Sequence, residues 1–230
     1  MKKKLAWLAF VLISTATFAQ KDTTVTKKDR KRNISLETTM GTIIIRLSDS
    51  TPLHRDNFIK LVKSGYYDGV LFHRVIKDFM IQSGDPQSIT AEPGKPLGNG
   101  GPEYRIPAEF RQTLFHRKGV IAAARDNNPE KASSGSQFYI VQGKKFSDTG
   151  LDSAEIRSQH KIPDDHREVY RTIGGTPHLD QNYTVFGEVV KGIEVVDSIA
   201  VVPTSKGVDR DRPLTDVKIV KAKLIKRKKK

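Results

Sequence analysis

The sequence predicts a mainly β fold, either a closed antiparallel barrel or a sandwich, from three features of its 230 residues. Short apolar runs alternate with glycine and proline, as strands alternate with turns in antiparallel β-proteins. Only two segments have the apolar spacing of a helix. One polar stretch around residues 150–175 interrupts the pattern and is interpreted as an insertion. The apolar runs lie at residues 71–76, 79–82, 119–124, 137–141, 183–190 and 216–224.

The first two strands are expected between residues 36 and 47, on either side of a turn at Met40 and Gly41. The isoleucines at residues 43–45 supply β-branched side chains, which favour extended backbone. Ordered structure is therefore expected to begin near Ile34.

Two helices are predicted to pack against these strands. Thr51 can cap the first, Pro52 suits its first position and Gly65 suits its exit. A shorter amphipathic helix is predicted over residues 192–200. The insertion, rich in charged residues, is expected to form one or two exposed helical turns around Pro163. Four side chains form the apolar face of the first helix: Leu53, Phe58, Leu61 and Val62.

The net charge of +14 lies at the two ends of the chain. Residues 1–32 carry +7, residues 221–230 carry another +7, and residues 33–220 are balanced. A nucleic-acid-binding domain normally presents a basic face of its own. We therefore expect no specific nucleic-acid partner, although the basic ends could attract polyanions or envelope components weakly.

The N-terminus has the pattern of an exported protein. Residues 1–19 join three lysines, an apolar run and small residues before Ala19, as in a signal peptide. Residues 20–32 are polar and basic and are predicted to form a disordered linker, and residues 226–230 form a basic tail. The chain has no cysteine, so it offers no disulfide and no lipid-anchor thiol. We expect export, to a bacterial periplasm.

Residues 72–86, with the sequence FHRVIKDFMIQSGDP, resemble the signature of the cyclophilin family. The resemblance extends over residues 33–225, which we expect to form one domain. It implies a closed eight-stranded antiparallel β-barrel capped by two α-helices. It also implies peptidyl-prolyl cis/trans isomerase activity, without a cofactor or metal. Further blocks follow in the family's order at residues 98–102, 106–110, 119–125, 134–140, 178–180 and 183–187.

The resemblance also implies a set of site residues. Arg74 would be the catalytic donor, with Gln82 orienting it or the substrate carbonyl and Phe79 beside it. An arginine suits this role because its guanidinium stays charged at any relevant pH. Backbone groups near Ala124 and Arg125 would bind the peptide. The implied substrate-binding residues are Met80, Ala124, Arg125, Gln137, Tyr139, Leu179 and Tyr183.

Two positions depart from the family pattern. Tyr183 stands where many members carry histidine, but it keeps an aromatic ring with a polar tip. His178 stands where others carry tryptophan, a residue that contacts cyclosporin in the family. We therefore expect isomerase activity, whereas the sequence does not determine cyclosporin sensitivity.

Other functions have less support in the sequence. His160 and His166 lie near two aspartates, but their spacing has no pattern distinctive of a metal site. No serine-hydrolase motif is present. A non-catalytic chaperone that grips proline-containing segments remains the alternative on the same fold. For either function we expect a monomer whose partners are unfolded or partly folded polypeptides that contain proline.

Overall fold

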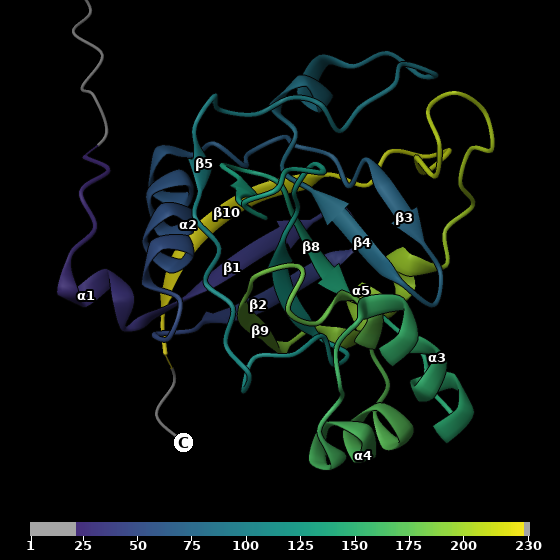
Figure 1. The fold of residues 1–230 in the computed structure, drawn as a ribbon. Coiled ribbons are helices and arrows are strands. Elements are labelled where there is room, and N and C mark those ends of the chain that lie inside the picture. Colours follow the sequence, from purple (N-terminus) through teal and green to yellow (C-terminus); the bar gives the residue numbers. More distant parts are fainter. Residues whose placement is uncertain (1–21, 228–230) are drawn as a thin grey trace, which may run out of the picture.

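The computed structural model describes residues 22–227. The predicted signal peptide lies outside this range, as do residues 228–230 of the predicted basic tail. Figure 1 shows the arrangement of the described elements. Their bounds are α1 Lys27–Arg30, β1 Arg32–Thr38, β2 Gly41–Leu47, α2 Pro52–Ser64, β3 Arg74–Ile76, β4 Met80–Ser83, η1 Pro86–Thr90, β5 Arg105–Ile106, β6 Val120–Ala123, β7 Ser133–Ser134, β8 Phe138–Val141, α3 Asp148–Ser158, α4 Asp164–Thr172, η2 Pro177–Leu179, β9 Val185–Lys191, α5 Ile193–Ala200 and β10 Ile219–Lys226.

Eight strands form one antiparallel sheet, in the order β10-β1-β2-β9-β6-β8-β4-β3. No ladder among the described residues joins its edges, β10 and β3. The expected closed barrel is therefore not confirmed, and the sheet is an open half-barrel. Isolated backbone bonds span the opening in place of a ladder. The N–H of Phe72 donates to the carbonyl of Val217, and that of Ile219 to the carbonyl of Val70, both at 2.8 Å.

The first hairpin has the predicted turn. β1 and β2 pair around Met40 and Gly41, with Thr38 opposite Gly41. Ile43 and Ile45 are fully buried, as alternate residues on the inner face of a strand should be. β1 begins at Arg32, slightly before the expected start.

Helix α2 has the predicted ends, but its first turn is capped differently. The hydroxyl of Thr51 makes no capping bond. The carboxylate of Glu109 instead accepts the N–H groups of Leu53 and His54, at 3.2 and 3.0 Å. Leu53 is 51% exposed and His54 is buried, so the apolar face is shifted from the predicted one. At the exit Gly65 adopts φ +81°, a left-handed conformation that glycine adopts without strain.

The main core lies between the curved sheet and two helices, α2 and α5. Phe58 of α2 contacts the rings of Phe138 and Phe186 from β8 and β9, at centroid distances of 5.3 and 5.4 Å. Val196 and Ile199 of α5 are fully buried in the same core. This packing confirms the two predicted helices and leaves the other face of β4, β6 and β8 for a second cluster.

The N-terminal segment differs from the disordered linker expected over residues 20–32. In its described part, α1 begins with a capping box in which Thr26 and Asp29 bond each other's backbone. The Asp29 carboxylate also contacts Lys63 Nζ at 3.1 Å, and Arg30 pairs with Asp56 at 2.7 Å. These charge-assisted contacts hold the segment against α2, and composition alone did not indicate them. At the other end, residue 226 of the predicted tail belongs to β10.

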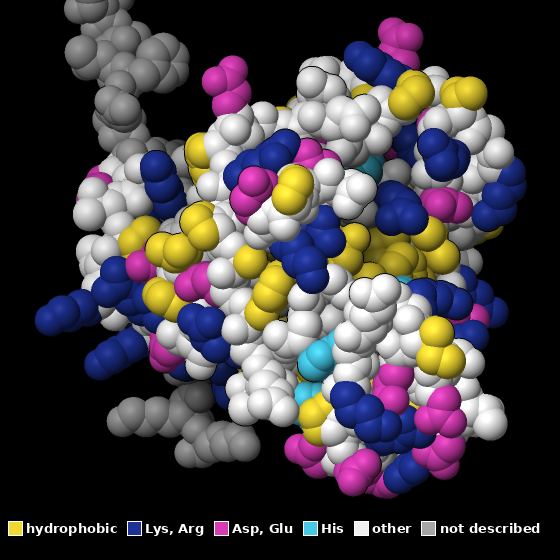
Figure 2. All heavy atoms as spheres, viewed as in Figure 1, with side chains coloured by type: hydrophobic (Ala, Val, Ile, Leu, Met, Phe, Trp, Pro, Cys, Tyr) yellow, Lys and Arg dark blue, Asp and Glu magenta, His cyan; other side chains and the backbone are white. Residues whose placement is uncertain are grey.

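The insertion forms two helices, α3 and α4, on either side of Pro163. It is thus more regular than the one or two turns expected. Leu151, Ile162 and Tyr170 are buried in a small core of their own. Arg167 of α4 binds three carboxylates of α3, and Figure 2 shows acidic and basic side chains intermixed over both helices.

Backbone bonds close the neck of the insertion. The N–H of Gly175 donates to the carbonyl of Lys144 at 3.0 Å, and the N–H of Lys144 donates back at 3.4 Å. A Cβ on Gly143 would lie 2.5 Å from the Gly175 backbone, so glycine permits this close approach. The two ends of the excursion therefore lie side by side. None of the described helices combines the length and apolar character that crossing a bilayer requires.

Candidate active site

Strand register aligns the central predicted residues on the face opposite the main core. Arg74 of β3 pairs with Gln82 of β4, and Gln82 pairs with Tyr139 of β8. Side chains alternate along a strand, so neighbours such as Ile81 and Ile140 point into the core and are fully buried. The alternation that builds the core thus places Arg74, Gln82 and Tyr139 in one row on the other face.

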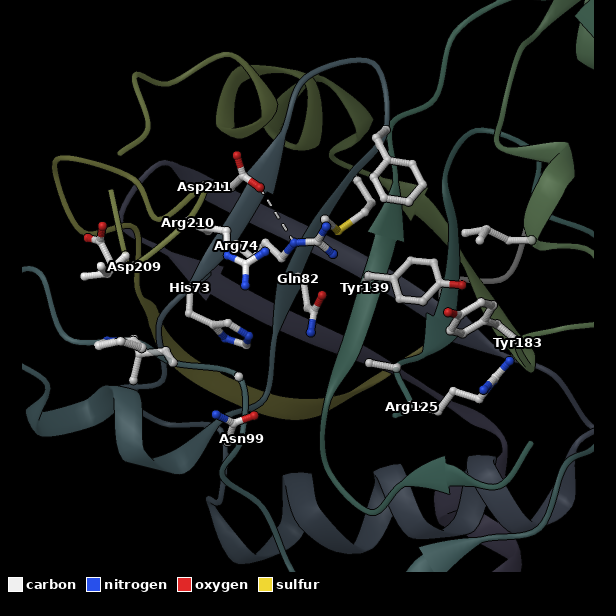
Figure 3. Close-up of a pocket in the computed structure, with 18 residues that line it drawn as sticks. His73, Arg74, Gln82, Asn99, Arg125, Tyr139, Tyr183, Asp209, Arg210 and Asp211 are labelled. Carbon is white, nitrogen blue, oxygen red and sulfur yellow. Dashed lines mark ion pairs between the residues drawn. The ribbon is translucent and has the colours of Figure 1, made fainter. Parts of the chain in front are cut away.

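A hollow of about 480 Å³ lies over this row (Figure 3). Of the ten predicted site residues, nine line it, and Gln137 is the exception. Figure 3 shows Arg74 extended across Gln82, with Tyr139 beside them. The nine are Arg74, Phe79, Met80, Gln82, Ala124, Arg125, Tyr139, Leu179 and Tyr183.

The Arg74 side chain is 43% exposed and has one carboxylate neighbour, Asp211. The distance from its Nε to Asp211 Oδ2 is 3.8 Å, too long for a direct hydrogen bond. The carbonyl of Asp211 accepts the N–H of Val75 at 2.8 Å, which fixes this loop beside β3. The loose pair lets Asp211 orient the guanidinium while its terminal nitrogens stay available in the hollow (Figure 3).

Gln82 is held by Gln137, which does not line the hollow but lines a neighbouring pocket together with Gln82. Nε2 of Gln82 donates to Oε1 of Gln137 at 3.1 Å. Nε2 of Gln137 donates to the carbonyls of Gly98 and Gly100, at 2.9 and 2.8 Å. The side-chain amide of Gln137 thus makes three hydrogen bonds to other groups of the protein, and one of them supports Gln82. The carbonyl oxygen of Gln82 is thereby turned away from Gln137.

The 98–100 loop is clamped from its other side by Asp85, whose carboxylate accepts the N–H groups of Gly98 and Gly100. A Cβ on Gly100 would lie 2.1 Å from an oxygen of Asp85, so this close approach requires glycine. The loop is therefore a tight turn, and it forms one rim of the hollow through residues 98 and 99.

The apolar wall is formed by Phe79, Met80, Tyr139 and Leu179, which belong to the second hydrophobic cluster. Burial raises the pKa of the Tyr139 hydroxyl well above its usual value, so this group stays protonated. Its oxygen lies 2.9 Å from Nε2 of His116. Figure 3 shows this hydroxyl directed away from Arg74. The ring of Tyr139 is thus available to the hollow while its polar end is engaged behind it.

The remaining rim is formed by Ala124, Arg125 and Tyr183. The guanidinium of Arg125 lies 4.7 Å from the ring centroid of Tyr183, which packs edge-on against Tyr139. The backbone of Ala124 is engaged within the protein. Its N–H donates to the carbonyl of Gln137 at 2.9 Å, next to the β6–β8 pairing, and its carbonyl accepts the N–H of Ser134 from β7 at 2.8 Å. Binding of a peptide by backbone groups near Ala124 and Arg125 stays a prediction.

Several lining residues were not among those predicted, and His73 and Asp211 are the most informative. Burial lowers the pKa of His73 to about 4, so its ring is neutral at pH 7 and Arg74 supplies the charge beside it. His73 stood inside the signature block and could have been found there. Asp211 lies in a charged loop far along the chain, and only the tertiary fold brings it to Arg74. The other unpredicted residues are Pro96, Leu97, Gly98, Asn99, Val208, Asp209 and Arg210.

Comparison with known proteins assigns the family. A model described as "Cyclophilin type peptidyl-prolyl cis-trans isomerase/CLD" matches residues 33–224. The chain belongs to the cyclophilin family. Isomerase activity is the activity of this family, and the named relatives of this cyclophilin agree with it.

A "Putative peptidyl-prolyl cis-trans isomerase" of Staphylococcus haemolyticus is 34% identical to this cyclophilin over 193 residues, covering 84% of this chain and 90% of the relative. A "Peptidyl-prolyl cis-trans isomerase-like 1" of Neurospora crassa is 34% identical over 197 residues, covering 84% and 94%. A crystal structure of a Cryptosporidium parvum cyclophilin shares the fold, with a TM-score of 0.62 and 23% identity over 86% of this chain and 99% of that one. The same Cryptosporidium protein in the presence of the dipeptide Ala-Pro gives a TM-score of 0.60.

Metal-ligating side chains are dispersed in this cyclophilin. No group of three or more histidine, aspartate or glutamate side chains within residues 22–227 is placed to hold an ion. In the insertion, His166 stacks on Phe115 at a centroid distance of 3.7 Å, and Arg167 occupies three of the carboxylates. His166 and these three carboxylates therefore take part in contacts within the insertion.

Proposed function

We propose that this protein accelerates rotation about Xaa–Pro bonds in exported polypeptides, with Arg74 stabilising the twisted amide. The observation that supports it most is the position of Arg74, whose guanidinium lies half-exposed at the edge of a hollow walled by Phe79, Met80 and Leu179. A proline ring is apolar and fits such a wall, which would bring the prolyl nitrogen to the arginine.

The reaction needs no bond to be made or broken. Partial double-bond character gives the peptide bond a rotation barrier of about 18–20 kcal/mol. As the bond twists, resonance is lost and the lone pair of the prolyl nitrogen localises. A fixed cationic donor then binds the twisted amide better than the planar one, and this difference lowers the barrier. Arg74 can donate in this way because Asp211 orients it without a short bond to it.

Magnitudes show that Arg74 needs help. Uncatalysed isomerisation takes tens of seconds, so a millisecond turnover requires about 10⁴-fold acceleration, or roughly 5.5 kcal/mol. One charge-assisted hydrogen bond contributes only about 1.5–3 kcal/mol. The rest must come from a pocket that is already in place before the substrate binds. Gln82 is the best-placed contributor, because Gln137 and the 98–100 loop hold its side chain in one orientation.

An isomerase assay with Arg74→Ala tests this function directly. We expect kcat/KM to fall by about 10- to 150-fold, the equivalent of the one charge-assisted hydrogen bond. Arg46→Ala is the matched control, because Arg46 is similarly exposed, at 47%, and lies outside the hollow. Wild-type protein that bound the peptide without accelerating its isomerisation would contradict the proposal and favour the non-catalytic chaperone.

Three further parts of the proposal rest on the sequence. We propose that residues 1–19 are removed on export and that the mature protein acts in the periplasm as a monomer. N-terminal sequencing of protein from the periplasmic fraction, together with sedimentation analysis, tests both points. We also propose that the basic C-terminal residues contact polyanions weakly. Deletion of residues 226–230 should then reduce salt-sensitive retention on an anionic matrix.

A further inference from the structure

A second pocket, of about 350 Å³, opens beside the proposed active site where the insertion meets the sheet. Phe79, on the turn between β3 and β4, lines both this pocket and the hollow that contains Arg74. Figure 1 shows α3 beneath that turn. His178 stacks on Phe79 with a centroid distance of 5.7 Å and lines the second pocket. The two pockets are therefore neighbours across one aromatic side chain.

One stripe of α3 faces this pocket. Gly150, Ser153, Ala154 and Arg157 line it, at the i, i+3, i+4 and i+7 spacing of a single helix face. The small residues leave the space open, and Arg157 at the end of the stripe supplies a charge. The insertion thus contributes a wall to the pocket.

The charges of the pocket are unbalanced. Asp148, Asp152 and Glu155, the three carboxylates of α3, are all paired with cations of the insertion. Arg157, the cation of the same helix, has no ion pair within residues 22–227, and neither has Lys144 across the pocket. The cavity is therefore lined by two cations with no carboxylate partner, Lys144 and Arg157, and by one carboxylate, Asp78.

Thr176 and His178 line the pocket beside these cations. The Thr176 hydroxyl is buried and has no partner in the described part of the chain. The neighbouring His178 adds no charge at neutral pH, because burial lowers its pKa to about 4.

We infer that this pocket is a substrate subsite that selects an acidic side chain, aspartate or glutamate, a few residues from the proline. The inference rests on the proposed isomerase function. An extended peptide advances about 3.3 Å per residue, so a side chain two or three residues from a proline bound against Phe79 reaches the neighbouring pocket. Lys144 and Arg157 would bind the carboxylate.

Peptides with one Xaa–Pro bond test this subsite. Glutamate is placed in turn at each of three positions on either side of the proline, and each peptide is compared with its glutamine counterpart by exchange NMR, which needs no helper protease. At one position we expect glutamate to raise kcat/KM by about 3- to 10-fold, the effect of one or two partly exposed ion pairs. This preference should decline as sodium chloride is raised from about 50 to 500 mM.

Charge-neutralising variants locate the effect. Arg157→Gln and Lys144→Gln should each lower the ratio of the glutamate to the glutamine peptide toward one. Lys145→Gln is the matched control, because it removes the same charge from the next residue, which is exposed and does not line the pocket. Equal ratios for all three variants and the wild type would overturn the subsite, as would equal rates for glutamate and glutamine at every position.

The glutamine peptides separate this inference from the proposed function. If the wild type isomerises them but shows no preference for glutamate, the subsite is wrong and the isomerase function stands. If it isomerises none of them, the proposed function itself fails.

Discussion

Two buried histidines have the same kinds of partner in different parts of the molecule. Nδ1 of His54 lies 2.7 Å from a Glu109 oxygen, and its Nε2 lies 2.9 Å from the hydroxyl of Ser133. For His116 the corresponding distances are 2.8 Å to Asp180 and 2.9 Å to Tyr139. In both cases the carboxylate also accepts the backbone N–H of its own histidine. The hydrogen-bond patterns are nearly interchangeable.

Their surroundings decide what the two clusters do. His54, Glu109 and Ser133 are each between 1% and 6% exposed, so the serine cannot reach a substrate despite its histidine and carboxylate. This cluster anchors the first turn of α2. The second cluster ends at Tyr139, whose ring lines the hollow beside Arg74. An acid–histidine–hydroxyl arrangement is thus no evidence of catalysis by itself, and its access to a pocket has to be established separately.

Removal of Glu109 should have the largest effect on stability. In Glu109→Ala, His54 and two N–H groups of α2 lose their acceptor, and we expect a loss of about 3–5 kcal/mol in the free energy of unfolding. Urea denaturation measures this loss, with the exposed Glu130→Ala as the control. The isomerase activity per folded molecule should be unchanged, and a specific loss of activity would show that this cluster is more than an anchor.

His73 sharpens the comparison because neither of its ring nitrogens has a partner in the described part of the chain. Its pKa of about 4 lies below the ordinary 6.5, so the unfolded chain binds more protons between these values. Stability should therefore be complete above pH 6.5 and fall on acidification toward pH 4, by about 2–3 kcal/mol from this residue. Urea titrations at several pH values should show a flatter profile for His73→Leu, and identical profiles would contradict the assignment.

Asp180 connects the second cluster to the active site, so Asp180→Asn should affect stability and activity together. The change weakens the bonds from His116 and from the hydroxyl of Tyr170, which lies 2.7 Å from Asp180. We expect a loss of about 2 kcal/mol in stability. We also expect about a tenfold lower kcat/KM, because Tyr139 loses its fixed support. Measurement of both on one preparation distinguishes this result from that for Glu109→Ala.

The smallest effects come from the two hydroxyls. Ser133→Ala and Tyr139→Phe each remove one hydrogen bond to a buried histidine and should each cost about 1 kcal/mol of stability. Only Tyr139→Phe should change catalysis, by less than about threefold, because the ring that lines the hollow remains. If Ser133→Ala lowered kcat/KM as much, the proposed difference between the clusters would be wrong.

Short-range patterns predicted the parts of this molecule that depend on neighbouring residues. Apolar alternation predicted the strands, Pro52 and Gly65 the ends of α2, and the signature block the row of Arg74 and Gln82. Contacts between distant segments were not predictable in this way. His116 and Asp180 lie 64 residues apart, and no local signal links them. The ion pairs that order α1 likewise depend on side chains of α2.

The same distinction applies at the site. The hydrogen-bond partners of the Ala124 backbone, Gln137 and Ser134, could not be predicted because strand pairing cannot be read from one segment. Gln137 was predicted to bind substrate. Its side-chain hydrogen bonds to the 98–100 loop could not be predicted, because only the complete sheet brings these two segments together. The opening between β3 and β10 has a similar cause, since residues 70–72 have apolar side chains suited to a strand but form only isolated backbone bonds and no continuous ladder.

The hydrogen-bonded neck at Lys144 and Gly175 brings the two ends of the insertion together. Because the chain leaves and returns at adjacent points, the insertion can differ in length without stretching the half-barrel. It is nevertheless connected to the site, because the hydroxyl of Tyr170 in α4 donates to Asp180, which supports His116 and Tyr139. Exchange of this one excursion would therefore alter the wall of the second pocket and, through Asp180, the support of Tyr139.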